Sequence, residues 1–270
     1  MQYDNVKREL GRVFNRCPFL RKCFYFLLDT LLLRAWHVKR ELRRLKKTLP
    51  DNASALDAGA GFGQYTYYMS RLGRRWHVKA VDVKEEQVED CNRFFARINL
   101  QQRVRFEVAD LTEFSEPESY HLALSVDVME HIADDTSVFE NIFRSLKPGG
   151  VLLISTPSDR GGSDAAGHHD SFIDEHVRNG YNIDEIREKL RKTGFHKVEA
   201  SYTYGVPGHL SWILSMKTPL RLLNISRWFF LLLPAYYIVV FPFCLLLNLA
   251  DVLMRHSSGT GLKVKAEKAG

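Results

Sequence analysis

The chain has 270 residues, enough for one α/β domain with an appendage and a sizeable core. Its charge is uneven: residues 1–50 hold 13 lysines and arginines against 4 acidic residues, a net of +9 that exceeds the whole chain's +6 and leaves residues 51–270 at −3. The four cysteines form no C-x-x-C pair and no cluster with histidine, which excludes a disulfide-stapled or zinc-ribbon module and favours reduced thiols in the cytoplasm.

Residues 1–50 are predicted to form basic amphipathic helices. The second of them, Arg34–Lys47, is strongly basic, and Pro50 ends it. No secretory signal is expected, because the apolar run from Cys23 contains Asp29 and lacks a small-residue cleavage site. Two roles remain open: packing over the cofactor edge of the next domain, or contact with an anionic membrane at about 1 kcal/mol per basic residue. The apolar stripe of the first helix comprises Phe24, Leu27, Leu28, Leu31 and Leu32.

The stretch Leu56–Gly63, reading LDAGAGFG, opens the domain predicted over residues 51–206. A buried strand reaches Asp57, glycine then occupies alternate positions, and a helix is expected over Gln64–Leu72. A strand, a glycine loop and a helix in this order begin a doubly wound sheet, whose ligands bind at the carboxyl ends of the strands. Glycine tolerates positive φ and lets backbone approach a ligand. The D-x-G-x-G-x-G spacing differs from the dinucleotide fingerprint G-x-G-x-x-G.

The next two predicted strands each carry an acidic residue near their end. The strand Trp76–Val83 ends with Asp82, 19 residues beyond Gly63, which is the interval at which an acid meets ribose hydroxyls in nucleotide-binding sheets. A carboxylate can accept hydrogen bonds from both hydroxyls. The third strand, Arg103–Leu111, contains Asp110 near its end. The sequence therefore predicts a nucleoside site at these strand ends.

The predicted fourth strand, Tyr120–Val128, continues into the sequence D-V-M-E-H, which ends at His131. A K-P-G-G turn, Lys147–Gly150, then precedes a fifth strand. Together with the glycine loop, these motifs resemble, in their order, the class I S-adenosylmethionine (SAM) methyltransferases over roughly residues 53–204. The combination of D-V-M-E-H, L-K-P-G-G and I-S-T-P is most similar to the ubiquinone-biosynthesis type of O-methyltransferase.

The resemblance implies an α/β fold: a doubly wound, seven-stranded, mostly parallel Rossmann-like sheet with SAM as cofactor. In this family the glycine loop wraps the methionine end of SAM, and the acid after the third strand accepts from the adenine amino group. The residues that the resemblance assigns to the cofactor are Asp57, Gly59, Gly61, Gly63, Asp82, Asp110, Leu111 and Asp127.

Two histidines are candidate general bases. Methyl transfer from a sulfonium is an in-line displacement, and a hydroxyl acceptor benefits from a base with a pKa near neutrality. His131 follows the fourth strand and is the first candidate, although a capping or helix-orienting role is the alternative. His176 is the second, because His176-Val177-Arg178 resembles an H-V-R segment that borders the substrate pocket in related enzymes.

A divalent metal is an open alternative. Asp127, Glu130 and His131 stand at i, i+3 and i+4, so a helical turn would place all three on one face. Such ligands suit Mg²⁺, Mn²⁺ or Zn²⁺ holding a catecholate-like oxygen, as in some quinone-pathway enzymes. Asp127 departs from their E-x-x-E-H pattern, and its shorter side chain disfavours the site.

Residues 207–258 are predicted to be an apolar helical insertion before a last, antiparallel strand within residues 259–270. The uncharged run Trp228–Ala250 has 23 residues, but Pro234 and Pro242 are expected to break it into pieces of about two turns, too short for a ~30 Å hydrocarbon core. If both flanking strands join one sheet, the insertion starts and finishes on one side. A monotopic or re-entrant segment is favoured, and a buried lid and a single membrane span are the alternatives.

These features predict a SAM-dependent methyltransferase whose acceptor is a small amphiphile, such as a quinone, polyene or lipid that it O-methylates. The enzyme is expected to be cytoplasmic, peripheral or monotopic at the membrane face. The alternatives are a membrane-docking SAM-binding protein without catalysis, or an RNA methyltransferase. Nucleic acid is the less favoured partner, because no N/D-P-P-Y motif and no T-C motif follow the fourth strand.

Overall fold

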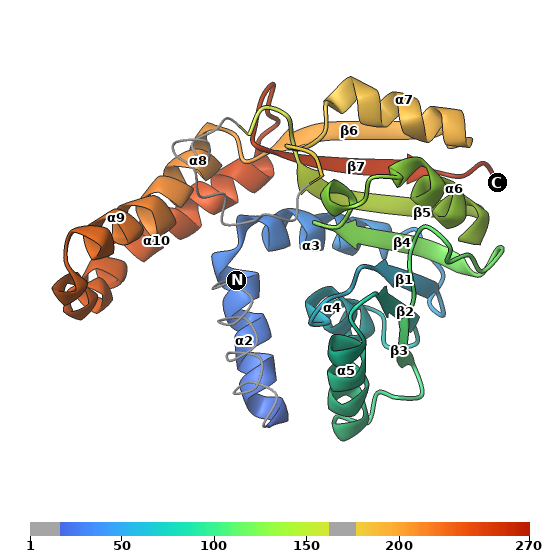
Figure 1. Ribbon diagram of the computed structural model, residues 1–270, viewed down its shortest axis with the longest axis horizontal. Coiled ribbons are helices and arrows are strands. Elements are labelled where there is room, and N and C mark those ends of the chain that lie inside the picture. The colour runs from blue at the N-terminus through green and yellow to red at the C-terminus, as the bar shows by residue number, and fades with distance from the viewer. Residues whose placement is uncertain (1–16, 162–176) are drawn as a thin grey trace.

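The computed structural model describes residues 17–161 and 177–270. Its centre is a seven-stranded sheet of order β3-β2-β1-β4-β5-β7-β6 (Figure 1). All neighbouring strands are parallel except β7, which runs antiparallel between β5 and β6. The predicted Rossmann-like fold and its antiparallel last strand are confirmed. The strands are β1 (Ser54–Ala58), β2 (His77–Asp82), β3 (Val104–Val108), β4 (Tyr120–Val126), β5 (Leu146–Pro157), β6 (Lys197–Thr203) and β7 (Gly261–Glu267).

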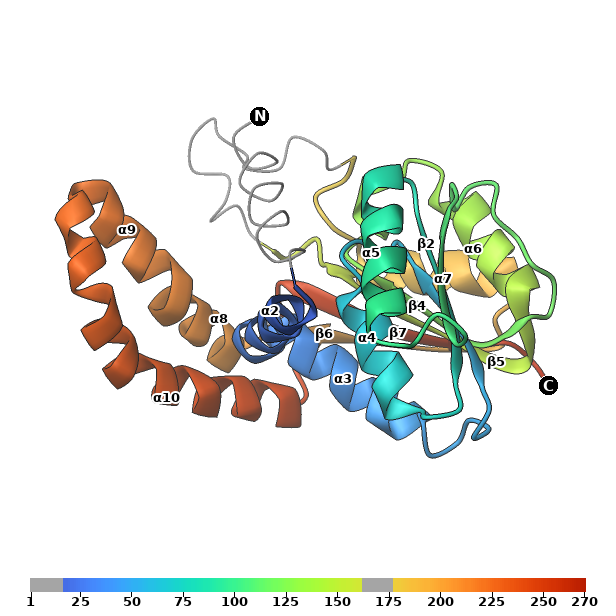
Figure 2. The same ribbon diagram turned by 90° about the horizontal axis from the view of Figure 1, so that it is seen from below.

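Helices cover both faces of the sheet (Figure 2). Side chains alternate across a strand, so Leu122 and Leu124 of β4 enter one core while Ala123 enters the other. Local signals set the helix ends: Asp134 accepts from the Ser137 amide at 3.1 Å, and Gly194, with φ +114°, ends the last of these helices. The helices are α4 (Gln64–Leu72), α5 (Glu85–Arg97), α6 (Asp135–Ser145) and α7 (Ile183–Thr193).

The N-terminal segment forms two helices, α2 (Pro18–Leu31) and α3 (Leu33–Leu45). Helix α3 is packed into the core that also holds α4 and α5, with Val38 and Leu42 fully buried. Helix α3 therefore packs against the domain, while its expected place over the cofactor edge stays a prediction. The predicted stripe of α2 is only partly covered, because Leu27 and Leu31 remain about half exposed.

Three predicted strand boundaries are wrong in ways that matter for the site. Strand β3 ends at Val108, so Asp110 belongs to the turn that follows. Strand β4 ends at Val126, which leaves Asp127 outside it with φ +51°. The K-P-G-G turn lies inside β5, where pairing with β4 shifts register and Gly149 takes φ +74°. A glycine at such a bulge lets the strand begin earlier than the sequence indicates.

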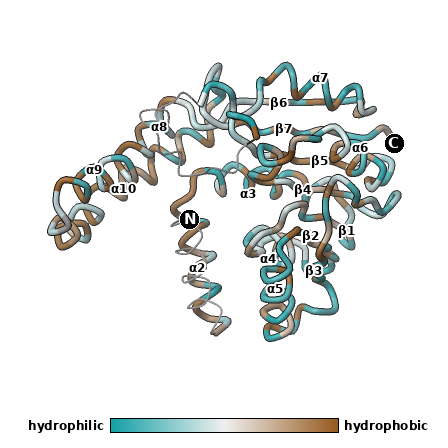
Figure 3. The backbone as a smooth tube through the Cα atoms, in the orientation of Figure 1, coloured by the Kyte–Doolittle hydropathy of each residue, from teal (hydrophilic) through white to brown (hydrophobic). Residues whose placement is uncertain are grey.

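The insertion forms a hairpin of helices, residues Val206–Leu253, which we call the apolar hairpin. It projects from the sheet domain (Figures 1 and 2), and apolar residues predominate along its length (Figure 3). Tyr236 and Tyr237 join its two arms by donating to the carbonyls of Leu214 and Ser215 at 2.7 and 2.8 Å. Its segments are α8 (Val206–Trp212), the π-helical turn η2 (Ile213–Lys217), α9 (Thr218–Ile225), the 3₁₀ turn η3 (Arg227–Leu231) and α10 (Leu233–Leu253).

The predicted break of the apolar run at its prolines is wrong. Pro234 lies in the first turn of α10, where a missing N–H removes no helical bond. Pro242 lies inside the helix, and Figure 2 shows that α10 curves while remaining continuous. A proline can bend a helix without ending it when flanking turns keep their hydrogen bonds. The result is one helix of 21 residues with a mean hydropathy of 1.9, long and apolar enough by composition to cross a membrane.

Candidate active site

The glycine loop lies at the carboxyl end of β1, where the strand order reverses between β1 and β4. Gly59, Gly61 and Gly63 all have positive φ, at +79°, +50° and +74°. A Cβ on Gly59 would come within 2.3 Å of Val128 Cγ2, whereas a Cβ on Gly61 would meet nothing closer than 3.9 Å. The loop is therefore pressed against the β4 end at Gly59 and leaves open space at Gly61.

Two predicted acids lie next to this loop. Asp57 is buried and accepts a hydrogen bond from the Thr66 hydroxyl, and burial raises the pKa of its carboxyl to about 7. Asp82 ends β2 and accepts from the Gly61 amide at 2.8 Å and from the Lys84 amide at 3.0 Å. The structure thus bonds the Asp82 carboxylate to the glycine loop. Its contact with ribose stays a prediction.

Asp110 and Leu111 follow β3, the strand beyond β2. The Asp110 carboxylate is exposed and accepts from both the amide and the hydroxyl of Thr112 at 2.8 Å. Leu111 is buried in the core that holds α6. The turn thus presents an anchored carboxylate at the same edge of the sheet as Asp82. The contact of Asp110 with adenine stays a prediction.

An ion pair that the sequence did not predict joins α3 to the end of β4 beside the glycine loop, in the region outside the strand ends where such sheets bind ligands, which we call the crevice. Arg34, in the first turn of α3, pairs with Asp127 after β4, and its amide donates to the Tyr204 hydroxyl at 2.9 Å. The Arg34 Nε and the Tyr65 hydroxyl are buried, and neither has a hydrogen-bond partner among the described residues. Unsatisfied buried polar atoms beside a glycine loop are groups that a polar ligand would complete. The sequence does not indicate which basic residue of α3 points toward the end of β4.

His131 ends the 3₁₀ turn η1 (Met129–His131) and is half-buried. The segment that begins at Val177 is bound to this turn: Val177 donates to the Glu130 carbonyl at 3.1 Å, and Arg178 donates to the Ile132 carbonyl at 2.7 Å. His176 itself lies outside the described residues. Val177 and Arg178 therefore lie beside the His131 turn, while the place of the H-V-R segment at a substrate pocket stays a prediction.

The candidate metal set does not assemble. Asp127 is held by Arg34, and the buried Glu130 accepts from the Thr156 hydroxyl at 3.0 Å. The expected helical turn is a three-residue 3₁₀ turn that follows a residue with positive φ, so the three side chains do not share one face. Across residues 17–161 and 177–270, no group of three His, Cys, Asp or Glu side chains could hold a metal ion.

Asp135 fixes the Arg178 segment to α6. Arg178 and Lys189 form ion pairs with its carboxylate, and the Tyr181 hydroxyl donates to it at 2.6 Å. Burial alone would raise the pKa of Asp135, but the tyrosine hydroxyl and the two cations hold it below its ordinary value. This cluster keeps the chain from Val177 onward next to the His131 turn.

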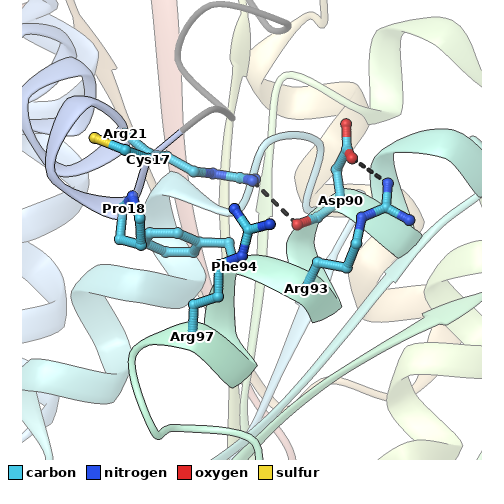
Figure 4. A pocket seen from close by; sticks show the side chains of 7 residues that line it. All are labelled: Cys17, Pro18, Arg21, Asp90, Arg93, Phe94 and Arg97. Carbon is cyan, nitrogen blue, oxygen red and sulfur yellow. Dashed lines mark hydrogen bonds and ion pairs between the residues drawn. The ribbon is translucent and has the colours of Figure 1, made fainter.

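Helix α2 is hydrogen-bonded to the glycine loop through two of its side chains, Arg21 and Tyr25. Arg21 is buried and donates to the Phe62 carbonyl at 2.9 Å and to the Asp90 carbonyl at 3.2 Å, and the Tyr25 hydroxyl also donates to Phe62. Figure 4 shows Arg21 reaching Asp90 across a small pocket of about 40 Å³. Because Arg21 of α2 bonds to the Asp90 carbonyl of α5, the pocket lies at a contact between these two helices, and the Arg93–Asp90 pair lies within α5.

Comparison with known proteins agrees with this geometry. The chain is 29% identical over 153 residues to phosphoethanolamine N-methyltransferase of Triticum aestivum, covering 56% of this chain and 30% of that protein. It is 32% identical over 104 residues to ubiquinone biosynthesis O-methyltransferase of Neisseria meningitidis serogroup A, covering 37% and 42%. The chain therefore spans less than half the length of these relatives.

Among solved structures, phosphoethanolamine N-methyltransferase 2 of Haemonchus contortus superposes with a TM-score of 0.59 at 23% identity, covering 87% of this chain and 53% of that one. This likeness shows the fold. A family model described as a methyltransferase domain matches residues 33–200, more than half of the chain. The chain belongs to the methyltransferase domain family.

Proposed function

We propose that this protein is a SAM-dependent methyltransferase that methylates an amphiphilic acceptor at a membrane. The observation that carries the proposal is the glycine loop at the reversal of strand order, with Asp82 bonded to Gly61 and the Arg34–Asp127 pair opposite. The Haemonchus relative is described in complex with S-adenosylhomocysteine and phosphomonomethylethanolamine, which supports the same cofactor class for this protein.

The residues present suit this cofactor. Asp82 would accept from the ribose hydroxyls, and the anchored Asp110 would accept from the adenine amino group. The open space at Gly61 would take the methionine end, and the unsatisfied Arg34 Nε and Tyr65 hydroxyl would donate to its carboxylate. When bound, SAM supplies an activated methyl group, so the protein's part is positioning and proton removal.

His131 is the proposed general base. It follows β4, a few residues beyond the Asp127 that lines the crevice, and the Arg178 segment holds its turn in place. His131 would accept the proton that the acceptor hydroxyl loses as the methyl–sulfur bond of SAM breaks and the methyl–oxygen bond forms, so the methylated product and the thioether would both leave neutral. A positioned base of this kind contributes about 10²–10⁴-fold to rate. The quinone-pathway relative is named as an O-methyltransferase, which is the reaction proposed for this protein.

The apolar hairpin supports an amphiphilic acceptor and a peripheral or monotopic place at the cytoplasmic membrane face. Ile225, Trp228 and Ile238 are each more than 75% exposed, and only 22% of the most apolar 18-residue stretch of α10 is buried. Soluble proteins rarely expose contiguous apolar surface of this extent. Both arms return to one sheet through β6 and β7, so an inserted hairpin would enter and leave from the same side.

The test is incubation of the protein with labelled SAM and a total lipid extract, followed by identification of the labelled product. The expected result is label on an amphiphile, with label lost in His131→Ala and retained in the exposed-surface control Glu188→Gln. Tight SAM binding without transfer to any lipid would overturn the proposal in favour of a non-catalytic SAM-binding protein. Label confined to added RNA would overturn it in favour of an RNA methyltransferase.

A further inference from the structure

A fully buried carboxylate lies at the root of the apolar hairpin, away from the residues assigned to chemistry. Asp251, in the last turn of α10, accepts from His37 Nε2 at 2.8 Å, from the Tyr204 amide at 3.2 Å and from the Gly208 amide at 3.0 Å. His256 Nε2 is hydrogen-bonded to the Asp251 backbone carbonyl at 2.8 Å and lies 3.3 Å from Oδ2, the oxygen that accepts from Gly208. These five residues, which we call the Asp251 hub, join α3, the end of β6, α8 and α10.

The packing at the hub leaves no space for adjustment. A Cβ on Gly208 would come within 2.7 Å of Asp251 Oδ2 and 2.6 Å of Leu33 Cδ2, and a Cβ on Gly205 would come within 2.1 Å of His256 Nδ1. A buried carboxylate is costly unless its hydrogen bonds are made, so the four elements must keep this arrangement together. A displacement of the hairpin root would therefore displace α3 as well.

The hub is continuous with the crevice. Tyr204 donates its amide to Asp251 and accepts at its hydroxyl from the amide of Arg34, whose guanidinium pairs with Asp127. Tyr204 has φ +56°, an unfavourable conformation for a non-glycine residue that its bonded neighbours maintain. His37 stands one turn after Arg34 on α3, so both residues move with that helix.

The hub is also continuous with the surface that we propose meets the membrane. Ser211 of α8 donates to the Cys244 carbonyl of α10 at 3.3 Å, and the tyrosine bonds between the arms lie farther along the hairpin. The arms are therefore joined from root to middle, while the tip projects away from the sheet (Figure 1). A bilayer that fixes the tip would restrain the hairpin as a unit at its root.

We infer that Asp251 is a positioning residue that couples membrane docking of the apolar hairpin to the Arg34 side of the cofactor crevice, an inference that rests on the proposed function. Docking selects the arrangement in which the hub is closed, α3 is held and Arg34 meets Asp127. By thermodynamic linkage, vesicles then tighten SAM binding, and SAM tightens vesicle binding by the same factor.

The test is calorimetric titration of SAM into the full chain, with and without vesicles of phosphatidylcholine and phosphatidylglycerol. The wild-type chain should bind SAM about fivefold or more tightly with vesicles, within the usual range of coupling between sites. Asp251→Asn should reduce this ratio to near one, because a neutral amide no longer holds the donors of α3 and α8 together. Asp184→Asn, which removes an exposed carboxylate on α7, should keep the wild-type ratio.

A second pair of variants covers the case in which Asp251→Asn does not fold. His37→Gln retains a donor toward Asp251 and should keep the ratio, whereas His37→Leu should lose it. Equal ratios in all variants, or a wild-type ratio near one in a chain that does bind vesicles, would overturn the inference and leave the proposed function standing. Neither titration uses an acceptor, so failure of the lipid-extract assay overturns only the proposed function, and failure to bind vesicles overturns membrane docking itself.

Discussion

Two glycines of the same loop should respond differently to one added methyl group. Gly59 and Gly61 both have positive φ, so alanine at either position meets a backbone cost of about 1–2 kcal/mol. At Gly59 the new Cβ would also lie 2.3 Å from Val128 Cγ2, and such overpacking adds about 1–3 kcal/mol. At Gly61 the nearest atom is 3.9 Å away, so no second cost arises.

The expected loss of stability is therefore about 2–5 kcal/mol for Gly59→Ala and about 1–2 kcal/mol for Gly61→Ala. For a chain of 270 residues these losses lower Tm by about 4–9 °C and about 2–4 °C respectively. Melting by circular dichroism measures the loss of stability, and calorimetric titration with SAM measures the change in cofactor affinity. Gly61→Ala should melt close to the wild type yet bind SAM at least tenfold more weakly, because its methyl group occupies the open side of the loop.

Equal melting shifts in the two variants would show that the Val128 contact is relieved by local movement. A Gly61→Ala protein with unchanged SAM affinity would refute the assignment of the open side to the cofactor. Gly149→Ala is the matched control, because Gly149 also has positive φ with open space around it but lies at the opposite end of the sheet. It should lose similar stability to Gly61→Ala without any loss of SAM affinity.

The remaining predictions concern the site and the hairpin. Asp82→Ala should abolish SAM binding in calorimetry while Tm falls by only a few degrees; unchanged affinity would remove its ribose assignment. His131→Ala should lower the rate of methyl transfer about 10²–10⁴-fold with SAM affinity retained, as measured in single-turnover assays. Because burial raises the pKa of Asp57 to about 7, the folded state binds more protons than the unfolded state between pH 4 and 7. The free energy of unfolding should therefore fall as pH rises through that window. Asp57→Asn should flatten this dependence in urea melts, and an unchanged slope of unfolding free energy against pH would contradict the prediction. Replacing the exposed Ile225 and Ile238 with serine should weaken vesicle sedimentation without lowering Tm, whereas a large fall in Tm would indicate that another surface covers them in solution.

Sequence reasoning succeeded where local chemistry determines structure. Strand periodicity led to the correct sheet. The spacing from Gly63 singled out Asp82, whose carboxylate bonds to the Gly61 amide, while its contact with ribose stays a prediction. The caps of α6 and α7 were predictable for the same reason, since an Asn or Asp side chain bonds amides only two or three residues away.

Sequence reasoning failed where the partner of a side chain lies far along the chain. Arg34 and Asp127 are 93 positions apart, and no local pattern distinguishes Arg34 from its basic neighbours. The metal hypothesis failed because it assumed a regular helical turn, while Asp127 takes φ +51°. The predicted break at Pro242 was wrong because the effect of a proline depends on whether the adjacent helical turns can bend, which the sequence does not show.

The two roles considered for the basic N-terminal segment concern different faces of one helix. On α3, Arg34 faces the crevice, His37 faces the hub, and Glu41 accepts from Lys263 of β7 at 2.8 Å, so one side of the helix joins the site, the hairpin and the last strand. The exposed basic residue Arg43 lies on the other side, whereas Arg44 bonds to Glu41 at 2.7 Å. Packing and attraction to an anionic surface therefore do not compete. A membrane would then act on α3 in two ways: by attracting its exposed face, and through the anchored hairpin at the Asp251 hub. Both would act on the helix that carries Arg34 to the crevice.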